Sequence, residues 1–484
     1  MKPLRFLLLF LLVFGSAAQA DVDRDIRALL ADRLLERATV GLHIVQLGDS
    51  PRQSHTVFTL NAQEPLIPAS NMKLLTTTAA LERLGTDFRF RTMLVQRGSD
   101  LVIVGDGDPS FGDAEMLKKV GWDVTTVYES WAQVLQKRNI TTVRDVLVDD
   151  SVFDEEFFHP NWDSRQSSAR YAAQVAGLCL NVNCVDFYLQ PTALQQPVRY
   201  HMKPATAYVQ VIRNTCLTSA KANEVSLARL NGANRIALGG QSPGHTQNPL
   251  SVSVHDPALY GATVLAETLA GAGIRLGGSV KRDRTIRAQL AAKDPACVVL
   301  AVHETPLATV IARTNKESMN VYAESLCKRT GFAATGQSGT WANGTAAAAA
   351  LLRQLEVPQQ QFQLDDGCGL SRRNALSAAA IVRLLVHNHH SRHAKVFLDS
   401  LPVAGRDGTL ERRFENSDLR GRVFAKTGFI SQVRALSGYL HGRDQRWYAF
   451  SILLNHVPEG TKQSMNALME NILKTVDAAA PRGS

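Results

Sequence analysis

Three short motifs occur in a fixed order along this chain of 484 residues and constrain its fold more than any other feature. The first pairs Ser70 with Lys73 as Ser-x-x-Lys, the second pairs Ser318 with Asn320 as Ser-x-Asn, and the third is Lys-Thr-Gly, beginning at Lys426. The two serines lie 248 positions apart. A fold that unites the motifs must bring distant parts of the chain together, so the segment between them is expected to be an insertion with a core of its own.

The residues around Ser70 predict the start of a helix. A turn-like stretch at residues 65–68 precedes it, and apolar residues then recur at helical spacing until Gly85. Lys73 follows three residues after Ser70 and therefore falls on the same helical face. We expect its amine to reach the serine hydroxyl.

The sequence pattern changes between residues 91 and 295, where short alternating strands such as residues 101–104 and 145–148 are expected, separated by turns. This pattern predicts a β-rich insert of two subdomains. Residues 21–90 and 296–484 are then expected to form one discontinuous domain of the α/β (α+β) class.

The last third of the chain predicts helices around a sheet. The expected elements are helices over residues 307–329 and 340–355, three strands within 422–455 broken by Gly428 and by residues 442–444, and an amphipathic helix from Met465 to Val476. This final helix is expected to cover the sheet, because its polar face is not basic enough to favour a membrane.

Together the motifs indicate acyl transfer by a serine nucleophile. A serine hydroxyl is a weak nucleophile at neutral pH and needs a base within hydrogen-bond reach, which Lys73 supplies if it is neutral. Burial and the nearby charge of Lys426 are expected to favour the neutral amine. Ser318 is then expected to relay protons between Lys73 and the departing amine, and Asn320 to hold Lys73 and the substrate amide.

The remaining expected roles concern charge on the substrate. Backbone N–H groups of Ser70 and Phe429 are expected to meet the oxyanion, beside Gly428 of the third motif. Taken singly, Ser70 as a helix cap and Lys73 as a solvated residue of the first helical turn are the favoured interpretations. The order of the three motifs makes their joint occurrence by chance improbable.

The N-terminus has the pattern of a secretory signal peptide. Lys2 and Arg5 precede an apolar stretch at residues 6–14 and an Ala-Gln-Ala cleavage sequence ending at Ala20, so we expect export to the periplasm with removal of residues 1–20. A membrane anchor is the alternative, but the apolar run is too short to span a bilayer. Loss of the two basic residues lowers the formal charge from +9 to +7, and without a dense Lys/Arg run no nucleic acid partner is expected.

Six cysteines lie in the part expected to be exported, where disulfides persist. Only Cys179 and Cys184 are close enough in sequence to suggest a pair. A zinc site is the alternative, but the cysteines and histidines lack the usual ligand spacing. No metal and no cofactor are expected.

At these residues the chain resembles the D-alanyl-D-alanine carboxypeptidase/endopeptidase family, the class C low-molecular-weight penicillin-binding proteins. The resemblance covers nearly the whole mature length, and the stretches that carry it are residues 68–76, 107–109, 315–318, 366–372, 401–405, 408–410 and 425–428. It implies a penicillin-recognising serine transferase fold with two inserted domains. It also implies peptidoglycan stem peptides as substrates and acylation by β-lactams.

Further roles are implied by the resemblance alone. Asp149 matches an insert aspartate that faces the active site and binds a diamino-acid amine, although a turn aspartate is the alternative. Arg372 matches an arginine at the mouth of the site. Thr427 with Lys426 is expected to hold the substrate carboxylate, whereas Phe429 replaces a usual threonine or serine and removes one hydroxyl. Cys368 also replaces a usual serine.

The favoured interpretation is therefore a DD-peptidase that trims D-alanine or cuts peptide crosslinks through an acyl-enzyme on Ser70. A β-lactamase of the same fold is one alternative, but no dedicated deacylating carboxylate is identified. A catalytically weak wall-binding protein, in which Phe429 has compromised the site, is the other alternative. A measurement of peptide turnover distinguishes a catalytically weak wall-binding protein from a peptidase.

Overall fold

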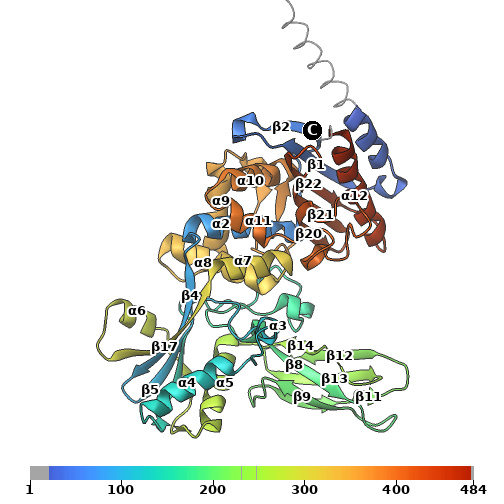
Figure 1. Cartoon of the computed structure of the whole chain (residues 1–484). Helices are drawn as coiled ribbons and strands as arrows, with labels where there is room; N and C mark the ends of the chain where they lie inside the picture. The colour runs from blue at the N-terminus through green and yellow to red at the C-terminus, as the bar shows by residue number, and fades with distance from the viewer. Residues whose placement is uncertain (1–20, 231, 247, 481–484) are drawn as a thin grey trace, which may run out of the picture. The chain divides into compact units, whose positions relative to one another are not determined.

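The computed structural model describes residues 21–230, 232–246 and 248–480 (Figure 1). The chain packs as two compact units. The first unit comprises the N-terminal part to Glu82 together with Ile311–Met319 and Thr345–Ser484, and the second comprises Arg83–Val310 and Asn320–Gly344. The expected domain boundaries at residues 90 and 296 stay a prediction, and residues 320–344 pack with the second unit. The predicted signal peptide lies outside the described residues.

A five-stranded antiparallel sheet forms the centre of the first unit. Its order is β2 (His55–Leu60), β1 (Thr39–Gln46), β22 (Trp447–Asn455), β21 (Val433–His441) and β20 (Val423–Ile430). The three strands expected within residues 422–455 are present. The expected break at Gly428 is wrong, because this glycine lies inside β20 and the chain turns at residues 431–432.

Both faces of this sheet are covered. Along β22, Phe450, Ile452 and Leu454 belong to the core that also contains Met465 and Ile472 of helix α12 (Lys462–Ala479). Residues 21–30 are helical and contribute to the same core. Helix α10 (Ala378–His390) packs on β1, β21 and β22, and the short helix α11 (Ala394–Ser400) packs against α10. The amphipathic terminal helix thus covers the sheet, as its sequence predicts.

The segment that carries Ser318 is interrupted. A single helix over residues 307–329 is wrong, because α7 (Leu307–Lys316) ends before Ser318 and α8 (Asn320–Thr335) begins after it. Ser318 has a φ of 57°, which is incompatible with a continuing right-handed helix. The alanine-rich helix is present as α9 (Trp341–Gln354).

The second unit combines sheets with helices and is less purely β than its sequence predicts. Its first sheet has the order β16 (Val280–Arg282), β7 (Val146–Asp149), β5 (Asp100–Val104), β4 (Arg89–Arg97) and β17 (Cys297–Pro306). Helices α4 (Thr126–Lys137) and α5 (Pro257–Gly271) pack on each other and on this sheet, and the shorter helices are α3 (Ala114–Lys118) and α6 (Ile286–Ala291).

Besides a two-stranded parallel sheet of β6 (Thr142–Val143) and β15 (Arg275–Leu276), the second unit contains two further sheets. One is β14 (Leu250–Ser253), β8 (Cys184–Gln190) and β9 (Arg199–Lys203), and the other contains β10 (Gln210–Asn214), β11 (Leu217–Thr218), β12 (Glu224–Arg229) and β13 (Arg235–Ser242). Both of these sheets share one continuous core with the helices of this unit. Tyr128, Phe187, Ile236 and Tyr260 are buried in that core.

All six cysteines lie in the described part of the chain and are free thiols. The suggested pair is therefore not formed. The thiol of Cys179 faces the Ala176 carbonyl, and that of Cys184 faces the Val182 carbonyl. Burial raises the pKa of Cys179 to about 12, so its thiol is protonated at neutral pH. Among the described residues, no helix combines the length and the apolar character needed to cross a membrane.

Candidate active site

The structure brings Ser70 and Lys73 together. Ser70 lies in the short helix η3 (Ala69–Asn71), which leads directly into α2 (Met72–Leu84). The Nζ of Lys73 is 3.0 Å from the Ser70 Oγ and 2.8 Å from the carbonyl oxygen of Cys368, and the lysine side chain is fully buried. A primary amine in this position has the geometry required of a base for the serine hydroxyl.

Small residues on the sheet allow η3 to lie against it. η3 packs on β20 and β21, and a Cβ at Gly428 would lie 2.8 Å from the Pro68 carbonyl oxygen. The Nδ2 of Asn71 donates a hydrogen bond to the Ser437 Oγ at 3.0 Å. The glycine of the third motif therefore has a steric role: it permits the nucleophile segment to approach the strand.

Lys426 joins the second and third motifs. Its Nζ donates to the Ser318 Oγ at 2.8 Å and to the Thr427 carbonyl at 2.9 Å. Burial, and secondly the positive charge of Lys73, hold the pKa of Lys426 well below its ordinary value. Two buried ammonium groups repel each other, so this arrangement disfavours the state in which both lysines are charged.

Sequence reasoning missed the role of the loop at residues 366–369. The carbonyl of Cys368 accepts the second hydrogen bond from Lys73 and orients the amine. The buried carboxylate of Asp366 holds this loop by accepting hydrogen bonds from the Gly369 N–H at 2.7 Å and the Ser371 N–H at 2.6 Å. The sequence identified this loop only by family resemblance, because a backbone carbonyl carries no residue-type signal.

Gly369 is needed in that loop for two reasons. Its φ is 84°, a left-handed conformation that L side chains rarely adopt. A Cβ there would also lie 1.8 Å from the carbonyl oxygen of Ala69, the residue before the nucleophile. The loop and the nucleophile segment are thus in backbone contact.

The residues expected to bind the substrate lie on or beside β20. Side chains alternate along a strand, so Lys426 and Gly428 face η3, whereas Thr427 and Phe429 face the other way. The Thr427 hydroxyl donates to the Thr409 Oγ1 at 2.9 Å. Arg372 is exposed, and its guanidinium donates to the Ser431 carbonyl at 2.9 Å, in the turn between β20 and β21.

Phe429 is an exposed aromatic residue on the candidate binding strand. Its side chain is 53% exposed, and two cations face its ring: the Arg434 guanidinium at 4.2 Å and the Lys462 Nζ at 5.0 Å from the centroid. These cation–π contacts account for its position on the surface. The hydroxyl that threonine or serine would supply there is absent.

The other two candidate residues belong to the second unit. The Nδ2 of Asn320, at the start of α8, donates to the Tyr171 carbonyl at 2.7 Å. Asp149 is fully buried at the end of β7, and its two oxygens accept the Ser151 N–H at 2.8 Å and the Arg287 N–H at 2.6 Å. This geometry favours the turn-aspartate interpretation, and substrate binding by Asp149 stays a prediction.

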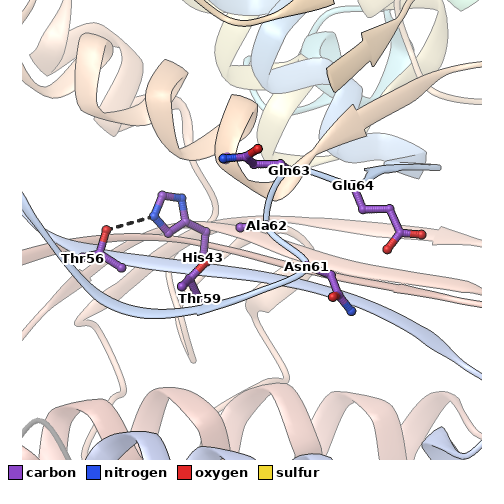
Figure 2. Close-up of a pocket in the computed structure, with 8 residues that line it drawn as sticks. His43, Thr56, Thr59, Asn61, Ala62, Gln63 and Glu64 are labelled. Carbon is purple, nitrogen blue, oxygen red and sulfur yellow. Dashed lines mark hydrogen bonds between the residues drawn. The ribbon is translucent and has the colours of Figure 1, made fainter. Parts of the chain in front are cut away.

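The first unit also contains a pocket of about 580 Å³ that includes none of the three motifs. Figure 2 shows His43 on β1, with its Nε2 3.3 Å from the Thr56 Oγ1 of β2, beside Asn61, Ala62 and Gln63. Burial lowers the pKa of His43 to about 4. The histidine is therefore neutral at physiological pH and gives this pocket no positive charge.

Comparison with known families decides the class of this site. The family model described as "D-Ala-D-Ala carboxypeptidase 3 (S13) family" matches residues 22–476. The chain belongs to this family. It is thus a serine-type D-Ala-D-Ala carboxypeptidase, and the resemblance drawn from the motifs is confirmed. The family match gives no support to a β-lactamase or a wall-binding protein.

Relatives of this S13 carboxypeptidase family match along nearly the whole chain. A D-alanyl-D-alanine carboxypeptidase from Actinomadura sp. (strain R39) is 30% identical, over 97% of this chain and 88% of the relative. The crystal structure of penicillin binding protein 4 from Haemophilus influenzae has a TM-score of 0.76 at 22% identity, covering 93% of this chain and 99% of that one.

A more distant structure has the same fold. It is a penicillin G acylated predatory endopeptidase from Bdellovibrio bacteriovorus, in complex with an immunity protein, with a TM-score of 0.51 at 15% identity over 92% of each chain. The expected mixed α/β fold of the penicillin-recognising serine enzymes is confirmed by these two likenesses.

Proposed function

We propose that this S13 carboxypeptidase forms a covalent acyl-enzyme on Ser70. The distance of 3.0 Å between the Ser70 Oγ and the Lys73 Nζ is the observation that carries the proposal. Neutral Lys73 takes the hydroxyl proton while Oγ attacks the carbonyl carbon of the penultimate D-alanine. The C–N bond then breaks, and the proton passes from Lys73 through the Ser318 hydroxyl to the leaving amine of the terminal D-alanine. Water hydrolyses the ester and returns the free enzyme.

The other motif residues have supporting roles in this proposal. Lys426 supplies a hydrogen bond to Ser318, at 2.8 Å, and a positive field for the substrate carboxylate, which Thr427 also binds. Backbone N–H groups of Ser70 and Phe429 stabilise the oxyanion. Asn320 orients the substrate amide. Arg372 is proposed to lie at the mouth of the site, and its exposed position beside the turn after β20 supports this role.

We further propose that the domain containing this site is discontinuous, with residues 21–90 and 296–484 around an insert of residues 91–295. The first compact unit supports this, because Ser70, Lys73, Ser318 and Lys426 all belong to it. Proteolytic trimming of the folded protein tests the boundaries by the ends of the resistant fragments.

The proposed substrates are peptidoglycan stem peptides, either with a D-Ala-D-Ala end or joined by a D-alanyl-diamino-acid crosslink. Family membership supports the first, and the likeness to a predatory endopeptidase supports testing the second. β-Lactams are proposed as acylating inhibitors, as in the penicillin G acylated relative. A substrate in the cell wall requires export, so residues 1–20 are proposed as a signal peptide removed on the way to the periplasm.

Mass spectrometry with benzylpenicillin tests the nucleophile. The purified protein should gain one penicillin mass, and peptide mapping should find it on Ser70. Ser70→Ala should give no adduct, whereas Ser54→Ala, a control serine in a loop of the first unit, should give the full adduct. An adduct on another residue, or none on the wild type, contradicts the assignment.

Digestion of defined muropeptides tests the reaction. Release of D-alanine from a pentapeptide measures carboxypeptidase activity, and conversion of a crosslinked dimer to monomers measures endopeptidase activity. Penicillin should inhibit both. Acylation without turnover of either muropeptide would instead favour the catalytically weak alternative. N-terminal sequencing of the exported protein should begin at Asp21.

A further inference from the structure

The second unit contains a polar pocket of about 500 Å³ that uses none of the motif residues. Its wall is formed by the connection between α3 and α4, which carries Trp122, and by strands β8 and β14. This volume is within the range of small-ligand sites. The chemistry of its lining residues indicates which chemical groups a ligand needs in order to bind there.

Trp122 gives the pocket an accessible aromatic face. Its side chain is 51% exposed, in the connection from α3 to α4. A single exposed aromatic residue is common on protein surfaces and indicates nothing alone. Here it lines a defined pocket together with Tyr188, whose ring is stacked on His201 with centroids 5.0 Å apart and an interplanar angle of 6°. Tyr188 is therefore held in place.

Buried hydrogen-bonding groups form another part of the lining. Asp186 is 5% exposed and Asn181 is 2% exposed. One Asp186 oxygen accepts the Ser251 hydroxyl, and the other accepts the Asn181 Nδ2 at 2.9 Å. Each carboxylate oxygen has a further lone pair, so Asp186 is a fixed acceptor with capacity for ligand hydroxyl groups.

The charged side chains of the pocket are largely paired with each other. The Arg170 guanidinium donates to Glu115 at 3.1 Å, and the Lys203 Nζ donates to Asp123 at 2.9 Å. Burial is the largest influence on Asp186 and raises its pKa above the ordinary value. Pockets that bind ions present an excess of one charge, whereas this lining offers paired charges, both donors and acceptors, and an aromatic face. A neutral polyhydroxyl ligand fits this combination.

We propose that this pocket binds a sugar of a glycan strand. The apolar C–H face of a sugar ring packs on Trp122, and its hydroxyl groups donate to Asp186 and accept from the paired cations. The choice of the peptidoglycan glycan strand rests on the proposed function. Binding there would keep the enzyme on its polymer and raise the effective concentration of the attached stem peptides.

Binding of peptide-free glycan strands, prepared by amidase digestion of peptidoglycan, tests this site directly. Titration calorimetry with the full-length Ser70→Ala protein separates glycan binding from catalysis. We expect saturable binding that weakens at least tenfold in Trp122→Ala and at least fivefold in Asp186→Asn. Val120→Ala is the matched control, because Val120 is 65% exposed in the same connection and does not line the pocket.

Activity on two substrates gives a second readout. Trp122→Ala should leave kcat/KM for a free pentapeptide within twofold of wild type and raise KM for stem peptides attached to glycan strands severalfold. Absence of glycan binding by the Ser70→Ala protein overturns the proposal, as does binding that both pocket substitutions leave unchanged. Neither result affects the Ser70 assignment, which penicillin acylation tests separately.

Discussion

The Nζ of Lys426 donates a hydrogen bond to the Ser318 hydroxyl at 2.8 Å, although the two residues are 108 positions apart. Ser318 lies in the break between α7 and α8, and Lys426 lies on β20. The contact joins the second and third motifs. With the hydrogen bond between Lys73 and Ser70, it forms the group of side chains proposed to move the proton from nucleophile to leaving group.

Replacing Lys73 should remove the general base. In Lys73→Met the amine next to Ser70 is lost while the length and apolar stem of the side chain are kept, so acylation by benzylpenicillin should slow by about 10²–10⁴-fold. Stopped-flow or quenched mass spectrometry measures the rate. Lys395→Met, which replaces an exposed lysine on helix α11, should acylate at the wild-type rate. A rate within tenfold of wild type in Lys73→Met would exclude Lys73 as the base.

A substitution of Asp149 distinguishes a structural role of this carboxylate from a role in substrate binding. Asp149→Asn replaces one of two buried acceptors by an NH₂ group facing a backbone N–H, so we expect the free energy of unfolding to fall by about 1–3 kcal/mol. Denaturant unfolding measures this change, with the exposed Asp87→Asn as control. At temperatures where the variant is folded, activity on stem peptides and on penicillin should be equal to wild type. A selective loss for peptides bearing a free diamino-acid amine would instead support the predicted substrate-binding role of Asp149.

Phe429 should limit substrate binding and contribute to stability. Phe429→Thr supplies the missing hydroxyl, and one additional hydrogen bond to the substrate carboxylate should raise kcat/KM for a D-Ala-D-Ala peptide by about threefold to tenfold. The same change removes the cation–π contacts with Arg434 and Lys462 and should lower the free energy of unfolding by about 1 kcal/mol. Phe429→Leu removes the ring without adding a hydroxyl. If Thr and Leu alter kcat/KM equally, the side chain at this position does not contact the substrate.

His43 should make stability depend on pH. Its pKa is lowered to about 4 by burial, whereas the unfolded chain has the ordinary value of 6.5. Above pH 6.5 both states are neutral and the histidine has no effect. Between pH 6.5 and 4 only the unfolded state binds the proton, so the free energy of unfolding decreases as the pH decreases. His43 accounts for up to about 3 kcal/mol of this decrease.

Unfolding by urea between pH 4.5 and 7.5 measures this effect. His43→Gln should lose less stability over that range than the wild type, and the exposed His55→Gln should behave as the wild type does. Equal slopes for His43→Gln and wild type would show that His43 is protonated in the folded state without penalty.

The sequence by itself determined the chemistry and most local elements. The three-residue step from Ser70 to Lys73 on a helical pattern placed the amine near the hydroxyl, because helical spacing alone brings such positions together. The strands β20 to β22 and the helix α12 followed from periodicities of two and 3.6 residues. Helical spacing and strand alternation are local properties of the chain, so the amino-acid sequence is sufficient to predict them.

Only the tertiary structure decided which distant groups meet. The hydrogen bond from Lys73 to the Cys368 carbonyl involves a backbone atom, which no residue pattern marks. The break at Ser318, the position of Gly428 inside β20 and the hydrogen bond from the Arg287 N–H to Asp149 also arise from packing between segments far apart in sequence. Periodicity reports which face of an element is buried, and it does not report what that face contacts.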